Sequence, residues 1–220
     1  MTSAVVQPRG AGSAHGEAVL RRDRTIDAIR GLAIILMIAD HTLGFAQNTD
    51  MAQPWMTVAR LSITRAALPA FMVCSGILLA GHSVSSRRWA QVLVAAVLVN
   101  TGALVAGMSE FVPDILALWC LVMLLAGPVR RAPATAAVLG MLQAVYWRVP
   151  IGTYQPGWIV AFVAIGVLVA RSGDREVLEP LGHRLPEWVA VMGRRPLSWY
   201  VGHLAVLGGL TGGGNLLGWW

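Results

Sequence analysis

The chain has 220 residues, of which 56% are hydrophobic and 13% are charged, and its mean hydropathy is +0.62. Soluble domains carry about 25% charged residues, so this composition excludes an ordinary soluble domain and predicts an integral membrane protein. All 17 basic residues are arginine, and we attribute the net charge of +6 to loops on the cytoplasmic side of a membrane rather than to nucleic-acid binding.

The chain is predicted to begin with a disordered cytoplasmic tail, residues 1–20, because this segment is rich in Ser, Ala and Gly and has no apolar stretch. Residues 21–220 form the predicted transmembrane domain. They contain seven apolar runs, at 26–46, 57–81, 89–107, 113–128, 133–149, 157–171 and 196–217. We therefore predict an all-α, polytopic transmembrane helical bundle with about seven spans, some of them shorter than the roughly 20 residues of a straight span.

Arginine placement predicts the orientation of this bundle. If the N-terminus is cytoplasmic, the inner segments contain 13 of the 17 arginines and the outer loops contain only Arg148. Positive charge accumulates in cytoplasmic loops, so we expect a cytoplasmic N-terminus and an outer C-terminus. The longest inner loop, about 172–195, is expected to form a short helix at the membrane surface.

The first run, Thr25–Ala46, carries ionisable side chains on one face. Arg30 and His41 are eleven residues apart, which places them about 20° apart around a helix and about 16 Å apart along it. Asp27 lies on the same side, about 60° from Arg30. Ionisable residues within a span usually face a protein interior or an aqueous cavity and mark functional sites. Arg30 and His41 are therefore the candidate catalytic residues, and Asp27 is a candidate substrate-binding residue.

His41 is the candidate catalytic base or acid, because histidine changes protonation near neutral pH; the alternative is a histidine that hydrogen-bonds a neighbouring helix. Arg30 is the candidate contact for a phosphate or carbonyl group, because its planar guanidinium donates paired hydrogen bonds; the alternative is an anchor at the membrane surface. We expect Asp27 to pair with Arg30 three residues later, and Asp40 to point away from His41.

The second run contains Arg60 and Arg65, which lie about 140° apart on a helix and so cannot both face one cavity. Pro69 removes the backbone hydrogen bond to the carbonyl of Arg65 and is expected to kink the helix there. Because freed carbonyls are common at membrane binding sites, Arg65 is the candidate substrate-binding residue of this run. Ser75 and Gly76 form a small-residue patch suited to helix packing.

The last run carries Tyr200 and His203, three residues apart and therefore on one helix face. Pro196 suits the first turn of this helix. We assign both side chains to substrate binding, with helix packing as the alternative for His203. The sequence has no ligand spacing typical of a metal site, and we expect no metal and no bound cofactor.

Three segments resemble a known family. The string RTIDAIRGLAIILMIADH, residues 24–41, resembles the first helix of the membrane acyltransferase 3 superfamily and of its relatives of the heparan-α-glucosaminide N-acetyltransferase type, in which ten residues separate an arginine from a histidine. The segments at 62–81 and 196–203 are similar to the second and terminal helices of the same relatives. The chain is identified as a shortened member, because it has room for fewer spans than typical members.

The resemblance implies an acyltransferase of a bacterial inner membrane. Its donor substrate would be acyl-CoA, with acetyl-CoA expected, and its acceptor a hydroxyl or amine of a glycan, a lipid-linked sugar or a small metabolite. By the same resemblance, His41 would activate the acceptor or carry the acyl group, and Arg30 would contact the donor. The alternative from a different class is a non-catalytic membrane carrier or accessory subunit that binds an anionic lipid or acid through Arg30 and Arg65.

If these residues form one site, Arg65 and His203 should both approach His41, because polar side chains within a membrane seek one another or a shared wet cavity. Arg65 belongs to the second predicted span, His203 to the last and His41 to the first. A shared site would therefore require these three helices to meet.

Overall fold

The computed structural model describes residues 23–47, 52–105, 115–147, 155–173 and 178–217. Within these ranges every regular element is a helix and no strand occurs. The prediction of an all-α fold is therefore confirmed for the described part of the chain. The predicted tail at 1–20, Arg148 and Arg175 lie outside it.

Each predicted apolar run forms a helix. The first three runs correspond to α2 (Arg24–Gln47), α3 (Pro54–Gly81) and α4 (Ser86–Val105), and the fourth is divided between α5 (Ile115–Leu124) and α6 (Ala126–Arg131). The last three correspond to α7 (Pro133–Tyr146), α8 (Pro156–Ser172) and α11 (Pro196–Leu217). Two short helices, α9 (Glu179–Arg184) and α10 (Glu187–Arg194), occupy the predicted inner loop.

Proline and glycine mark the ends of several helices. Pro54, Pro133 and Pro156 occupy the first turn of α3, α7 and α8, where the missing N–H leaves no intrahelical hydrogen bond unmade. Gly173 ends α8 in the left-handed conformation, with φ of 82°, which glycine adopts without a steric cost. Pro69, in contrast, lies inside α3, which continues through it.

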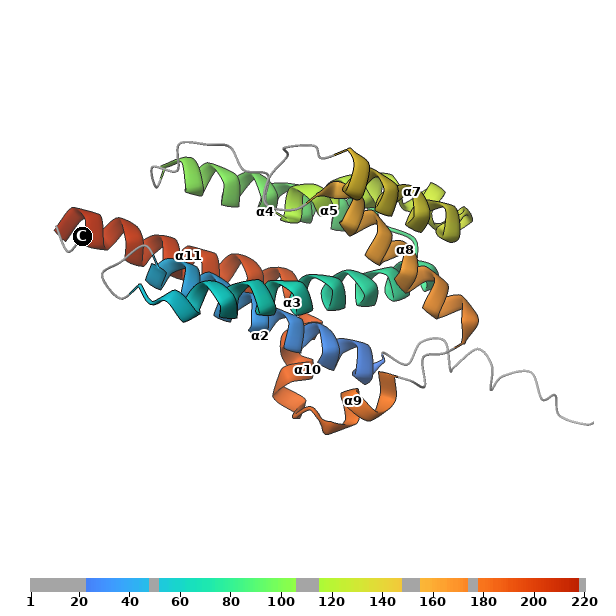
Figure 1. The fold of residues 1–220 in the computed structure, drawn as a ribbon, viewed down its shortest axis with the longest axis horizontal. Helices are drawn as coiled ribbons and strands as arrows, with labels where there is room; N and C mark the ends of the chain where they lie inside the picture. The colour runs from blue at the N-terminus through green and yellow to red at the C-terminus, as the bar shows by residue number, and fades with distance from the viewer. Residues whose placement is uncertain (1–22, 48–51, 106–114, 148–154, 174–177, 218–220) are drawn as a thin grey trace, which may run out of the picture.

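Figure 1 shows two groups of helices joined by α8. α2, α3 and α11 form one group, with α9 and α10 against the beginning of α2. In the other group α4 packs against α5, and α7 is connected to α5 through contacts with α6 and α8. α8 runs obliquely between the groups and packs against both α3 and α7. α11 contacts α2 and α4, so the last helix touches both groups.

Glycine allows the closest contacts between these helices. An added Cβ on Gly76 of α3 would lie 2.1 Å from the carbonyl oxygen of Val163 in α8, and Gly166, which faces Gly76, is equally restricted. Gly140 and Gly157 make the same kind of contact between α7 and α8. Small residues let helix backbones approach in this way, which confirms the packing role predicted for Gly76.

The buried core lies between α3, α4, α5 and α8, around Met72, Val92, Val122, Ile159 and Val163. Away from the core, α4, α7 and α11 expose large apolar side chains. These are Leu93, Val94, Val97, Leu98, Leu104, Val138, Leu139, Met141, Leu142, Val145, Val206 and Leu210. Continuous apolar surface of this kind suits a lipid environment better than water.

Within the described ranges, two helices are long and apolar enough to cross a membrane, namely α2 with 24 residues and α3 with 28. α5, α7 and α8 are apolar but shorter. Together with the exposed apolar faces, these helices indicate a membrane protein. The number of seven spans and the cytoplasmic N-terminus remain predictions.

Candidate functional site

A pair of histidines joins the first and last described helices. Nδ1 of His41 in α2 lies 2.7 Å from Nε2 of His203 in α11, and the two ring planes are inclined by only 14°. The ring of Tyr200 stands edge-on to both, with centroid distances of 6.1 Å to His41 and 5.4 Å to His203. The structure thus brings together three residues that the sequence predicted for one site.

The sequence of α11 explains this arrangement locally. The helix begins at Pro196, whose fixed φ is pre-organised for a first turn. Tyr200 and His203 follow on one face, and α11 packs against α2. Tyr200 is buried and His203 half-buried, so the pair lies inside the contact between the two helices.

The hydrogen bonds of the two histidines indicate which ring nitrogens carry protons. Nδ1 of His203 lies 3.0 Å from the backbone oxygen of Trp199, and a carbonyl can only accept, so Nδ1 of His203 carries a proton. In a neutral ring Nε2 of His203 is then the acceptor, and Nδ1 of His41 donates to it. Nε2 of a neutral His41 is therefore the nitrogen with the lone pair, as a general base requires.

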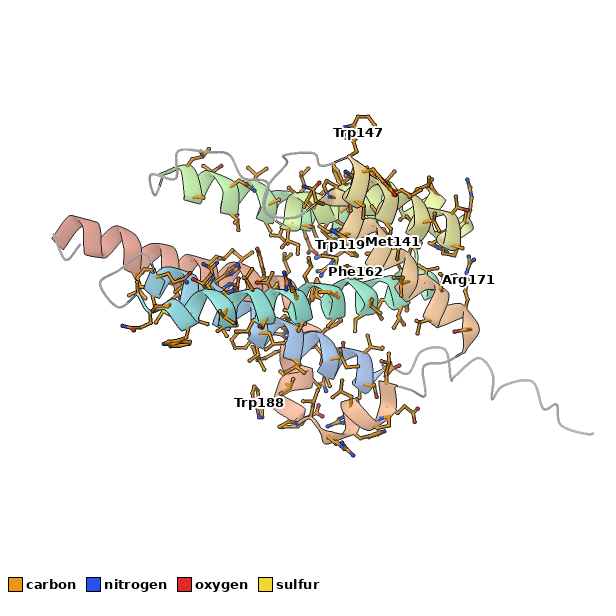
Figure 2. The ribbon with its side chains drawn as sticks, in the orientation of Figure 1. Trp119, Met141, Trp147, Phe162, Arg171 and Trp188 are labelled. Atoms are coloured by element: carbon orange, nitrogen blue, oxygen red, sulfur yellow. The ribbon has the colours of Figure 1, made fainter. Side chains whose placement is uncertain are left out.

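A cavity of about 300 Å³ adjoins this pair through Tyr200. Helices α2, α3, α4, α5 and α11 and the connection between α3 and α4 form its walls. The lining residues are Arg30, Met37, Phe71, Met72, Ser75, Leu78, Leu79, His82, Ser83, Val84, Ser85, Arg88, Val92, Ile115, Leu116, Trp119, Met123, Pro196, Leu197 and Tyr200. Most of them are apolar, and two are arginines. Trp119, labelled in Figure 2, forms part of the wall from α5.

Arg30 lies on the wall of this cavity. Its side chain is half-buried, and its guanidinium carbon lies 5.6 Å from the centre of the Phe71 ring. A guanidinium over an aromatic face is held by a cation–π attraction. Arg30 is thus positioned at the cavity by α3 as well as by its own helix.

Asp27 belongs to a different cluster, at the beginning of α2. Its carboxylate is buried and lies 3.9 Å from Nε of Arg194 in α10. Arg194 also hydrogen-bonds Glu187, whose carboxylate accepts a 2.8 Å hydrogen bond from Arg24. The sequence predicted a partner for Asp27 within its own helix but not this one, because Arg194 lies far along the chain. Asp27 does not line the cavity.

This cluster holds α10 tightly against α2. The hydrogen bond from Arg24 and the charge of Arg194 hold the pKa of the Glu187 carboxyl below its ordinary value. Gly31 and Gly193 let the backbones approach: an added Cβ on Gly193 would lie 1.7 Å from the carbonyl oxygen of Asp27. The cluster is therefore a structural junction between the two helices.

The structure differs from the sequence prediction at Arg65. Arg60, not Arg65, faces α2: its Nε lies 3.2 Å from Oδ1 of the buried Asp40, and it also donates to Gln47. Because five residues separate the two arginines by about 140°, Arg65 points the other way, is exposed, and does not line the cavity. Asp40 pairs with Arg60, a partner that the sequence did not predict.

Two further features were missed from the sequence. The hydrogen bond from His203 to the backbone oxygen of Trp199 corresponds to no side-chain pattern in the sequence. Arg88 resembled an ordinary loop arginine, yet it lines the cavity. Among the described residues no three His, Cys, Asp or Glu side chains form a group that could hold a metal ion.

Residues 22–165 match the model of the family described as "Heparan-alpha-glucosaminide N-acetyltransferase, catalytic". The match covers more than half of the chain and includes Arg30, His41 and Arg65; Tyr200 and His203 lie beyond it. No curated protein and no solved structure matches the chain.

Proposed function

The chain belongs to the family of heparan-alpha-glucosaminide N-acetyltransferase catalytic domains, and we propose that it moves an acetyl or other acyl group from acyl-CoA to a hydroxyl or amine within a bacterial inner membrane. The family supports an acetyltransferase-type activity. The identity of the donor, the class of acceptor and the roles of the catalytic residues belong to our proposal. The acceptor would be a glycan, a lipid-linked sugar or a small metabolite.

One observation supports the chemistry above all others, the hydrogen-bonded chain from His41 through His203 to the oxygen of Trp199. Nε2 of His41 removes the proton from the acceptor hydroxyl or amine as its oxygen or nitrogen attacks the thioester carbonyl carbon. The carbon–sulfur bond breaks, the electron pair leaves on the CoA sulfur, and the proton passes from His41 to that sulfur. His203 orients the ring of His41 and shares the charge that His41 gains.

The cavity beside Tyr200 supports the placement of the donor. Its apolar walls suit an uncharged thioester arm, and Arg30 presents a planar donor group suited to a carbonyl or phosphate oxygen. Holding the donor and acceptor in line is itself a large part of catalysis when the thioester is already activated. The alternative, a carrier that binds an acid through both Arg30 and Arg65, receives less support because Arg65 is exposed away from the cavity.

The test is acyl transfer by the purified full chain in lipid nanodiscs. Acetyl-CoA is the donor, glucosamine and methyl glucoside are the amine and hydroxyl probes, and the release of free CoA thiol is measured. We expect His41→Ala to lower transfer by about 10²- to 10⁴-fold, the usual contribution of a general base. The matched control is His183→Ala, which removes an exposed histidine in α9. Equal rates for His41→Ala and the wild type would exclude His41 from the mechanism.

The proposed orientation has its own test. Single cysteines at Ser85 and His183, both exposed, should resist a membrane-impermeant thiol reagent added outside intact cells and react after the cells are opened. Labelling of either position from outside would contradict a cytoplasmic N-terminus with this order of spans.

A further inference from the structure

A second groove, of about 660 Å³, lies next to the cavity. One wall is the beginning of α4, and the other is the end of α10 with the beginning of α11. Four of its lining residues are arginines, namely Arg87, Arg88, Arg194 and Arg195, and none of the lining residues is acidic. Arginines clustered around one groove attract a multiply charged anion.

Within the described part of the chain, only one of these four arginines has a visible role in holding the fold together. Arg194 pairs with Asp27 and Glu187 and so joins α10 to α2. No described residue forms an ion pair or a side-chain hydrogen bond with the exposed guanidinium groups of Arg87, Arg88 and Arg195. Like charges held close to one another repel, so a bound anion would stabilise this part of the structure.

The groove and the cavity beside Tyr200 are adjacent and share lining residues. Arg88, Pro196 and Leu197 line both. A molecule with its phosphate groups in the groove could therefore extend past Arg88 and place an uncharged arm in the cavity. Arginine suits phosphate in particular, because its planar group donates two parallel hydrogen bonds to phosphate oxygens.

We propose that this arginine groove binds phosphate groups of a ligand whose remaining part occupies the cavity. Two sources share this chemistry, the nucleotide end of the acyl-CoA donor and the headgroup of an anionic phospholipid. The residues that the groove shares with the cavity favour the donor, and that assignment rests on the proposed function. The phosphate site itself does not, because it depends only on Arg87, Arg88 and Arg195 and on the shape of the groove.

The first arm of the test measures the binding of CoA, dephospho-CoA and pantetheine to the full chain in nanodiscs of zwitterionic phosphatidylcholine. These probes carry progressively fewer phosphates on the same arm. If the groove binds the donor, CoA should bind at least about 10-fold more tightly than pantetheine, and Arg87→Gln with Arg195→Gln should remove that difference. Pantetheine binding should not change. Arg184→Gln, an exposed arginine outside the groove, is the matched control.

The second arm measures retention of phosphatidylglycerol by the purified chain in native mass spectrometry. Loss of the bound lipid in the same double variant, with CoA binding unchanged, would identify a phospholipid headgroup as the ligand. Groove-dependent binding in either arm supports the phosphate site. The proposed phosphate site would be overturned if the double variant bound both CoA and phosphatidylglycerol as well as the wild type does.

Two further measurements distinguish a variant that does not fold from a phosphate site that does not exist. Arg87→Lys and Arg195→Lys keep the charge and should give intermediate affinities, so they replace the glutamine variants if those do not fold. In the wild type, raising the salt to about 0.3 M should weaken the binding of CoA but not of pantetheine. The groove variants leave His41 in place, and His41→Ala leaves the groove intact. Failed transfer chemistry and a failed phosphate site therefore give different results.

Discussion

The two ends of α2 use ionisable residues in opposite ways. At its beginning, Asp27 pairs with a permanent cation, Arg194, and the backbone of α10 lies directly against the helix. Toward its end, Asp40 is paired with Arg60, but His41 is paired with a second histidine. A carboxylate–guanidinium pair keeps its protons fixed near neutral pH, whereas a histidine pair can gain or lose one.

This difference separates a structural role from a chemical one within a single helix. The charged residues at the beginning of α2 hold α9 and α10 in place, as shown by the hydrogen bonds from Arg24 to the carbonyls of Gly182 and Leu185. The histidine pair lies beside the cavity, and a sequence of hydrogen bonds runs from His41 through His203 to the backbone oxygen of Trp199. An ionisable residue in a membrane helix is therefore informative about chemistry only after its partner is known.

The largest effect should come from breaking the histidine pair. His203→Phe keeps the shape and stacking of the ring but removes the acceptor nitrogen, so Nδ1 of His41 loses its partner. We expect acyl transfer to fall by about 100-fold, within the range of general-base contributions. His203→Gln can still accept that hydrogen bond through its carbonyl oxygen and should recover much of the rate. If both variants lost acyl transfer equally, the hydrogen bond would not be the cause, and His203 would serve only in helix packing.

At the beginning of α2, the corresponding change should affect stability and not chemistry. Gly193→Ala would place a Cβ 1.7 Å from the backbone oxygen of Asp27, and we expect it to destabilise the fold by roughly 1–3 kcal/mol through overpacking. Thermal unfolding in detergent measures this. Gly202→Ala is the control, because nothing lies within 4 Å of the added atom. A midpoint for Gly193→Ala as high as that of the control would contradict the close packing of α10.

The two arginines of α3 allow a smaller test within one helix. Arg60→Gln leaves the buried carboxylate of Asp40 without its ion pair, and we expect a loss of about 1–2 kcal/mol, below the value for fully buried pairs because Arg60 is partly exposed. Arg65→Gln should be close to neutral in both stability and acyl transfer, because Arg65 is exposed outside the cavity. A strong effect of Arg65→Gln on transfer would restore it as a substrate-binding residue.

The smallest effect concerns Glu187 and depends on pH. Because its pKa is lowered in the folded state, Glu187 stabilises the fold above the ordinary glutamate pKa, and this contribution is lost as the pH falls through the lowered value. The thermal midpoint of the wild type should therefore exceed that of Glu187→Gln near neutral pH and converge with it in acid. A difference that stays constant from about pH 7 to about pH 3 would contradict the ion-pair role.

Much of the fold could be predicted from the sequence, because the apolar runs, prolines and arginines are local signals. The run at 113–128 was the exception, since α5 ends at Leu124 and α6 begins at Ala126. The packing of α2 on α10 was not predictable, because the sequence shows that Gly31 permits a close approach but not which segment makes it. The same limit applies to Asp27 and Arg194, which are neighbours only in the folded chain.

At the candidate site, helical spacing predicted which residues share a face but not which face meets another helix. It placed Tyr200 and His203 together, whereas the expected approach of His203 to His41 rested on the burial of polar side chains in a membrane. It could show only that Arg60 and Arg65 diverge, and the choice between them depended on the position of Asp40 one helix away. The position of a backbone group, such as the oxygen of Trp199, is set by the folded helix. The pattern of side chains in the sequence does not indicate it.

The distance in sequence between the paired histidines also has a consequence for biosynthesis. His41 lies in the first described helix and His203 in the last. A ribosome must therefore translate past α11, and α11 must then insert beside α2, before the hydrogen-bonded pair can form. During synthesis the nascent protein holds His41 without this partner, so any acyl transfer that needs the pair begins only after the last helix has docked.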